Sequence, residues 1–148
     1  SLASNRAQCI FAQLKLAGFL ATQKKNAEAL GLVEEGLKFS GDADILSTLL
    51  ALKKVGLLKA EGKFAEAAEA LTGLEGKVII TLRDQLKLQR AELLLLAGKK
   101  DDAKTLYEQL SVVNIQTEGK PVDFTDAPDP TVSNQARDQF LLMELGQL

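Results

Sequence analysis

The segment from residue 60 to residue 71 reads AEGKFAEAAEAL and places a helix breaker between two strongly helical runs. Gly62 can end one helix in a left-handed turn, Lys63 and Phe64 can open the next, and the alanines and glutamates that follow favour a helix. The segment therefore predicts a helical hairpin with small residues where its two helices approach each other.

The same combination of a turn and a following alanine occurs three times along the chain. QKKNAEALGLV precedes the segment at 23–33, and AGKKDDAKTLYEQL follows it at 97–110. Ala29, Ala67 and Ala103 hold the same place in the three segments, at spacings of 38 and 36 residues. Because such a period is typical of stacked helical hairpins, the sequence predicts an all-α solenoid of about three hairpins.

We expect one domain over residues 1–148, with seven helices. The hairpins are expected at about 5–39, 44–74 and 78–112, followed by a loop at 113–132 and a C-terminal helix at 133–147. The loop prediction rests on a lost helical period and on the three prolines, which all fall there. The last helix, with Ser133 or Asn134 as its N-cap, either covers the end of the stack or lies in its concave groove.

Composition and charge argue against a nucleic-acid partner and against a membrane-spanning helix within the chain as given. The formal net charge is −2, and the basic residues are scattered among acidic ones, so nucleic acid is not an expected partner. No apolar run approaches the length of about 18 residues that a membrane-spanning helix needs. The chain begins Ser-Leu without Met, so we expect a fragment or processed form from which an upstream signal or membrane anchor is missing.

Residues that usually carry catalysis or bind metals are scarce. The chain has no histidine and one cysteine, which removes the usual general base and the zinc ligand sets, and it has no glycine-rich phosphate loop. We expect no enzyme activity, cofactor or metal site. Asp123, Asp126 and Asp129 could form a weak cation site, but turn-forming aspartates are the favoured interpretation. Cys9 is expected to be a packed thiol in the first helix and not a reactive one.

Alignment of the three turns gives a register for the groove that stacked hairpins create. Ala17, Val55 and Ala91 are then the close contacts between the helices of each pair. The residues predicted to bind a protein or peptide in the groove are Phe11, Leu14, Lys15, Leu49, Leu52, Lys53, Leu88 and Glu92. Apolar contacts would hold the partner, and the charges would orient it. The alternative, which we favour for the leucines, is that they belong to the core.

The turns Gly-Lys-Phe and Gly-Lys-Lys, with Ala67 and Ala103 after them, resemble those of tetratricopeptide repeats. The inner helices lack the common Trp and Tyr of that family, and no proline closes the repeats. This resemblance implies a tetratricopeptide-like solenoid and a scaffold role, without naming a ligand.

A narrower resemblance covers residues 40–148, which are similar in order and spacing to the YfgM family of ancillary subunits of the bacterial Sec translocon. The points of similarity are the run Leu71–Gly76, Arg90-Ala91-Glu92 before Leu94 and Leu95, Gly98-Lys99, and an amphipathic C-terminal helix that contains Met143 and ends in Leu148. The resemblance implies a membrane helix before Ser1, a domain in the periplasm, and translocon subunits and periplasmic chaperones as partners.

We therefore expect a non-enzymatic scaffold that captures a helix or an extended peptide in its concave face. One alternative is a cytoplasmic adaptor that recognises the C-terminal carboxylate of a partner. Another is a homo-oligomer in which the Phe140–Leu145 side of the last helix fills the groove of its own or a neighbouring chain.

Overall fold

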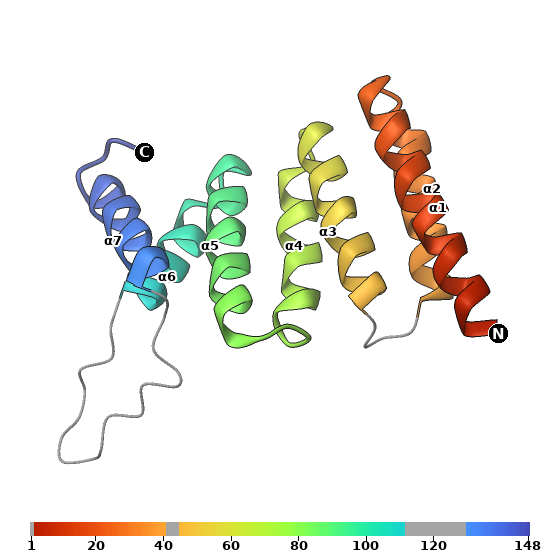
Figure 1. Ribbon diagram of the computed structural model, residues 1–148. Coiled ribbons are helices and arrows are strands. Elements are labelled where there is room, and N and C mark those ends of the chain that lie inside the picture. Colours follow the sequence, from red (N-terminus) through yellow and green to blue (C-terminus); the bar gives the residue numbers. More distant parts are fainter. Residues whose placement is uncertain (1, 41–44, 112–129) are drawn as a thin grey trace, which may run out of the picture. The chain divides into compact units, whose positions relative to one another are not determined.

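The computed structural model describes residues 2–40, 45–111 and 130–148. These residues form seven α-helices and no β-strand (Figure 1). The helices are α1 (Leu2–Thr22), α2 (Asn26–Phe39), α3 (Ile45–Ala60), α4 (Phe64–Glu75), α5 (Ile80–Leu96), α6 (Lys100–Ser111) and α7 (Pro130–Glu144). The all-α class and the succession of helical hairpins are confirmed.

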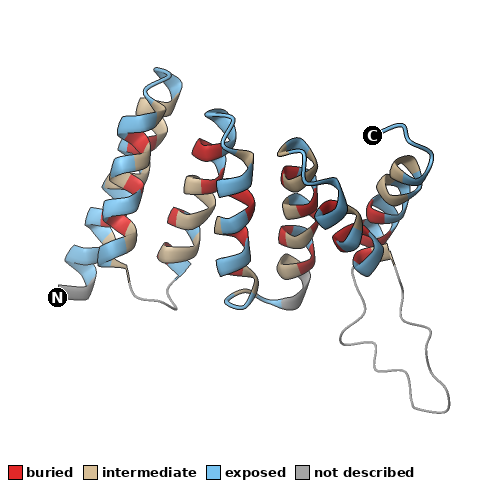
Figure 2. Cartoon of the chain, turned by 180° about the vertical axis from the view of Figure 1, so that it is seen from behind, coloured by how far each residue is buried: buried red, intermediate tan, exposed pale blue. Residues whose placement is uncertain are grey.

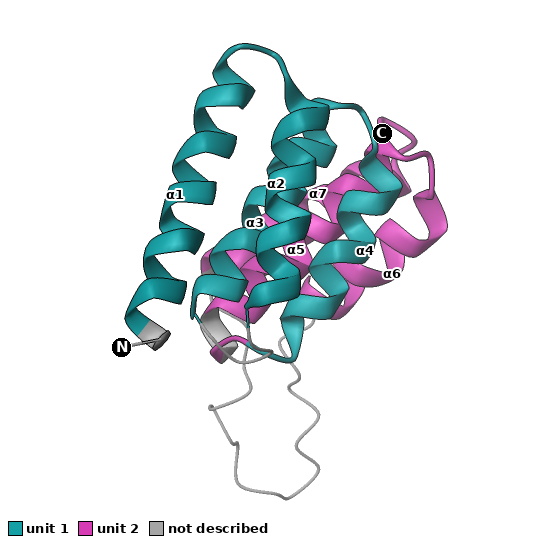
Figure 3. Ribbon diagram, turned by 90° about the vertical axis from the view of Figure 1, so that its right-hand side faces the viewer, with its two compact units in different colours: residues 1–77 teal, residues 78–148 magenta. Residues whose placement is uncertain are grey.

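The chain divides into two compact units, residues 1–77 and 78–148 (Figure 3). In the first unit, α1 packs on α2, α2 on α3, and α3 on α4. In the second unit, α5 packs on α6 and α6 on α7, and α7 also touches α5. The prediction of one domain over the whole chain stays a prediction.

Each hairpin turns through the same hydrogen-bonded motif. The second residue after the first helix has a positive φ, and the next backbone N–H donates to a carbonyl five residues earlier, as in a Schellman motif. The positive φ angles are 60° at Lys24, 73° at Gly62 and 77° at Gly98. The 2.9 Å bonds run from Lys25 to Leu20, from Lys63 to Leu58, and from Lys99 to Leu94. This identity of geometry fixes the residue-by-residue register of the three hairpins.

The repeated alanines lie at the centres of the hairpins. Ala29, Ala67 and Ala103 are fully buried, and their N–H groups donate to the carbonyls of the residues that precede the second helices. On the first helices, the predicted close contacts Ala17, Val55 and Ala91 are buried as well. Figure 2 shows that the helices carry both buried and exposed segments. A methyl group at the contact lets two helices approach closely, so these two sets of small residues determine the hairpin geometry.

The last helix begins earlier than the sequence predicts. It occupies the first of its two predicted places, where it covers the preceding helix. It begins at Pro130 instead of Ser133, because proline fits the first helical turn, where its missing N–H has no acceptor. Ser133 is consequently buried within the helix and is not its N-cap. Val132 and Ala136 pack into the core of the second unit, so α7 covers α6.

Cys9 is exposed on α1, and the prediction of a packed thiol is wrong. Apolar residues surround α1 on more than one side, so the sequence pattern does not identify the buried face. Ile10 and Ala17 face the core, and Cys9 falls outside that stripe.

Candidate functional site

Six of the predicted binding residues lie in the first unit and form two equivalent sets. Phe11, Leu14 and Lys15 on α1 are separated from Leu49, Leu52 and Lys53 on α3 by 38 residues each, which is the spacing from Ala29 to Ala67. We call these six residues the α1–α3 surface. Successive hairpins therefore present the same chemistry at the same register position, namely one apolar contact, one supporting leucine and one ammonium group.

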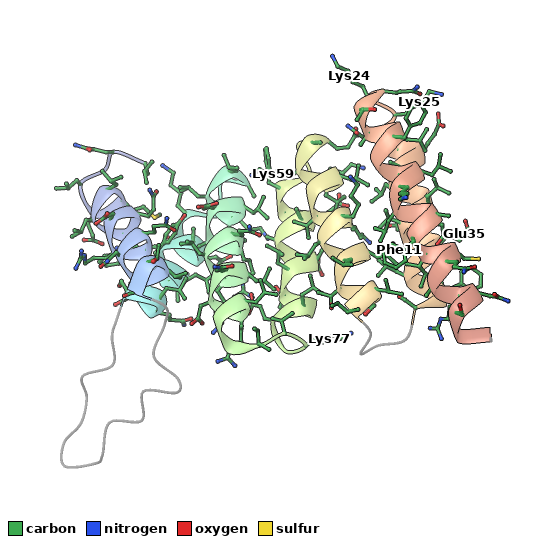
Figure 4. All side chains as sticks on the ribbon, viewed as in Figure 1. Phe11, Lys24, Lys25, Glu35, Lys59 and Lys77 are labelled. Atoms are coloured by element: carbon green, nitrogen blue, oxygen red, sulfur yellow. The ribbon has the colours of Figure 1, made fainter. Side chains whose placement is uncertain are left out.

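The outermost residues of the α1–α3 surface are large and apolar. Phe11 is 51% exposed and Leu49 is 43% exposed, and Figure 4 shows the Phe11 side chain on α1. Leu14 and Leu52 are half-buried, and Leu14 packs against the core of the unit. The expectation that these leucines belong to the core thus holds in part for Leu14, while Phe11 and Leu49 remain accessible to a partner.

At Gly18, the residue sets on α1 and α3 lie close to each other. A Cβ atom added at Gly18 on α1 would lie 3.7 Å from the Nζ atom of Lys53 on α3. The ammonium group of Lys53 therefore extends along the surface of α1, close to the set that contains Lys15. Two lysines without an intervening side chain at Gly18 give this surface a positive character.

The two predicted binding residues of the second unit, Leu88 and Glu92, differ in their exposure. Leu88 is buried in a core cluster formed by α5, α6 and α7, so the core position favoured for the leucines is confirmed for Leu88, and its alternative assignment to an accessible groove is corrected. Leu106 and Tyr107 of α6 and Val132 and Ala136 of α7 belong to the same cluster. Glu92 is exposed, and its charge adds to the burial that raises the pKa of Tyr107 to about 12.

A pocket between α2, α3 and α4 was not predicted from the sequence. Its volume is about 200 Å³, and its lining consists of Leu37, Ser40, Ser47, Ala51, Ala70, Gly73, Leu74 and Lys77. The hydroxyl of Ser40 is already engaged, since it donates to the carbonyl of Leu37 at 3.1 Å. Small residues on α3, on α4 and at the C-cap of α2 line this hollow, and no local sequence motif marks such a combination.

The described part of the chain offers neither a metal-binding cluster nor a membrane-spanning helix. Its Cys, Asp and Glu side chains form no group of three or more that could hold a metal ion. The aspartates considered for a cation site, at positions 123, 126 and 129, lie outside the described residues. Among the helices described, none combines the length and the apolar character needed to cross a bilayer.

Comparison with known proteins identifies no family. No family model matches the chain, and no curated protein or solved structure is significantly similar to it. The all-helical architecture, in which each helix of the described residues packs on its neighbours within its own unit, is therefore the level at which the protein is classified.

Proposed function

We propose that this protein is a non-enzymatic scaffold whose α1–α3 surface binds a segment of another protein. The observation that carries the proposal is the equivalent exposure of Phe11 and Leu49, which are 38 residues apart at the same position of successive hairpins. A large apolar side chain is costly to expose to water, and burial of a phenylalanine or leucine stabilises a complex by roughly 1.5–3 kcal/mol. Repetition of such a side chain at one register favours a partner that contacts both hairpins.

The positive charge of the α1–α3 surface favours a partner with acidic side chains. Lys15 and Lys53 flank the two apolar contacts, and Lys53 lies against Gly18. We expect a peptide or helix with apolar side chains at two points and carboxylates between or beside them. Apolar anchors then supply most of the affinity, while the ion pairs set orientation and accelerate association.

The proposal is tested by selection of peptides from a random library on the whole chain, with affinities then measured by calorimetry. Peptides that bind the native protein should lose at least about tenfold in affinity to the double variant Phe11→Ser/Leu49→Ser. Phe39→Ser is the matched control, because Phe39 is exposed to a similar degree at the end of α2. Equal binding to the native chain and the double variant would show that the α1–α3 surface is not the site.

The cellular partner is proposed from the YfgM resemblance alone: an exported chain, a translocon subunit or a periplasmic chaperone, met on the outer side of a bacterial inner membrane. A photoreactive amino acid in place of Leu49, in cells that make the protein, would crosslink to such a partner. Crosslinks to cytoplasmic proteins would instead favour a cytoplasmic adaptor, and crosslinks only between copies of the chain would favour self-association.

A further inference from the structure

The pocket between α2, α3 and α4, which we call the α2–α4 pocket, lies on the other side of α3 from the α1–α3 surface. Ser47 and Ala51 of its lining are each two residues away from Leu49. Two residues correspond to a rotation of about 200° around a helix, so the pocket and Leu49 face opposite ways. A ligand can therefore enter the α2–α4 pocket without covering the α1–α3 surface.

The α2–α4 pocket has the size of one large apolar side chain. An apolar cavity of roughly 150 Å³ takes up a benzene molecule, and this pocket has about 200 Å³. It can therefore hold the side chain of a leucine or a phenylalanine. Its apolar walls come from three helices and consist of Leu37 on α2, Ala51 on α3, and Ala70 and Leu74 on α4.

The hollow depends on small side chains at positions where a larger one has room. A Cβ atom added at Gly73 of α4 would have nothing within 4 Å, so the packing of neighbours does not require a glycine there. Glycine also lowers the helix propensity of this segment. Ala51 and Ala70 line the pocket as well and are half-buried. A leucine in place of one of these residues would fill the space that a ligand needs.

Two polar residues of the lining determine which chemical group fits beside the apolar walls. The hydroxyl of Ser40 donates its proton to the carbonyl of Leu37 at 3.1 Å, so its oxygen is left as an acceptor for a donor on the ligand. Lys77 is the one charged residue among the described residues of the lining. Its ammonium group has three N–H donors, so an existing interaction leaves donors for a ligand.

An acceptor and a donor beside an apolar hollow match a backbone amide, which presents an N–H and a C=O group together. A carboxylate only accepts hydrogen bonds, so it would suit Lys77 but would meet the lone pairs of the Ser40 oxygen. An ammonium group only donates, so it would suit Ser40 but would be repelled by Lys77. The lining therefore favours a neutral amide over either charged group.

We propose that the α2–α4 pocket binds one leucine- or phenylalanine-sized side chain of a partner protein. A backbone amide of the same segment donates to Oγ of Ser40 and accepts from Nζ of Lys77. The inference rests on the proposed function for the class of partner, a protein segment. It adds a second point of attachment, on another side of the first unit and with another chemistry.

The probe is N-acetyl-leucine N-methylamide, because it carries one apolar side chain between two amides. Its affinity for the whole chain would be measured by NMR titration of the backbone amides. It should bind about tenfold more tightly than N-acetylglycine N-methylamide, which has no side chain to bury. It should bind about threefold more tightly than N-acetyl-leucine methyl ester, in which an oxygen replaces an N–H donor. N-acetyl-leucine, with a carboxylate in that place, should also bind more weakly.

Variants of the lining test where the probe lies. Ala70→Leu should abolish binding, whereas Ala65→Leu, an exposed position of the same helix outside the lining, should leave it unchanged. Gly73→Leu is a second filling variant, since its Cβ meets no neighbour within 4 Å. Ser40→Ala should remove the preference for the amide over the ester. Thermal unfolding of each variant shows that the chain still folds.

Several results would overturn the inference. Equal binding to the native chain and to a folded Ala70→Leu or Gly73→Leu variant would place the probe outside the pocket. Tighter binding of N-acetyl-leucine than of the amide would identify an anion site. An amide preference that survives Ser40→Ala would show that Ser40 is not the acceptor.

The double variant Phe11→Ser/Leu49→Ser separates this inference from the proposed function. It should bind the probe as the native chain does, even where it loses the peptides selected on the whole chain. Loss of the probe in this variant, with binding retained in Ala70→Leu, would assign the probe to the α1–α3 surface and end the inference. Probe binding that depends on Ala70 sustains it, even if the double variant keeps every selected peptide and the proposed function fails.

Discussion

Lys24 and Gly62 occupy the same position of two successive hairpin turns, and both have a left-handed backbone, with φ angles of 60° and 73°. The same hydrogen bond closes both turns at 2.9 Å. Glycine adopts this conformation without a steric cost, whereas a residue with a Cβ atom loses roughly 1–2 kcal/mol. The first hairpin therefore keeps the turn geometry of the others with a residue that is poorly suited to it.

Lys24→Gly should stabilise the first unit by about 1 kcal/mol, because it relieves the strain at a positive φ. Chemical denaturation of the whole chain, followed by circular dichroism, gives the change in the free energy of unfolding. Lys24→Ala is the matched control, since it removes the charge but keeps the Cβ atom and should not stabilise. If the alanine and glycine variants are equally stable, charge and not backbone strain determines the effect.

Two glycines of α2 should respond in opposite ways to the same substitution. A Cβ at Gly36 would lie 3.1 Å from both methyl groups of Leu50 and 2.8 Å from Oε1 of Gln13, whereas nothing lies within 4 Å of a Cβ at Gly31. Gly31→Ala should stabilise by about 1 kcal/mol through helix propensity. Gly36→Ala should destabilise by roughly 1–3 kcal/mol through overpacking. Urea denaturation of both variants measures the difference, and stabilisation by both would show that α1 and α3 move apart without cost.

The positions of turns and of close helix contacts could be predicted from the sequence, because both depend on local chemistry. Glycine, lysine and alanine at fixed offsets identify the hairpin register, which Ala29 and Ala67 confirm by their complete burial. The burial of Leu88 could not be predicted in this way, because its core cluster includes Val132 and Ala136 of α7, which lie far from Leu88 in the sequence.

The sequence also does not predict which of two equivalent residues is exposed, because exposure depends on the helices packed nearby. Phe19 and Leu57 are both large apolar residues at the same register position, but only Leu57 has α2 packed nearby in its cluster. The pattern of residue types thus identifies a face as apolar, while the presence of a neighbouring helix decides whether that face is core or surface. The candidate site could accordingly be predicted in its register but not in its accessibility.

The attachment of α7 to α6 should depend on Lys104. Its ammonium group forms an ion pair with Glu144 of α7 and lies 5.8 Å from the centroid of the Phe140 ring. Lys104→Gln should speed amide hydrogen exchange along α7 and leave exchange in the first unit unchanged. Lys99→Gln is the control on a nearby exposed lysine. Exchange in α7 that is equally slow in both variants would show that the apolar contacts alone hold the helix.

The same ion pair predicts that the attachment of α7 to α6 weakens at alkaline pH. The hydrogen bond to Glu144, followed by the charge of that carboxylate, raises the pKa of Lys104 above its ordinary value of 10.5. A raised pKa means that the folded state holds the proton more tightly, so the contribution is complete below pH 10.5 and is lost as the pH rises further. Exchange in α7 should therefore accelerate above that pH more in the native chain than in Lys104→Gln, and identical profiles would contradict the assignment.

The buried hydroxyl of Tyr107 should destabilise the second unit. Tyr107 is fully buried, and its hydroxyl has no hydrogen-bond partner among the residues that the structure describes. A buried polar group without a partner costs about 1–3 kcal/mol, so Tyr107→Phe should raise the free energy of unfolding by about 1 kcal/mol at neutral pH. Urea denaturation at pH 7 gives this value, and a loss of stability would show that the hydroxyl has a partner in solution.

Alkaline pH separates this effect from a simple change in packing. Burial, with a smaller contribution from the charge of Glu92, raises the pKa of Tyr107 from its ordinary value of 10.0 to about 12. Between these values the unfolded chain loses the phenolic proton while the folded chain retains it, so the native protein loses stability as the pH rises. At pH 11 the advantage of Tyr107→Phe should therefore exceed its advantage at pH 7 by about 1 kcal/mol. An advantage that does not change with pH would mean that the folded phenol ionises as readily as the unfolded one and is reached by solvent.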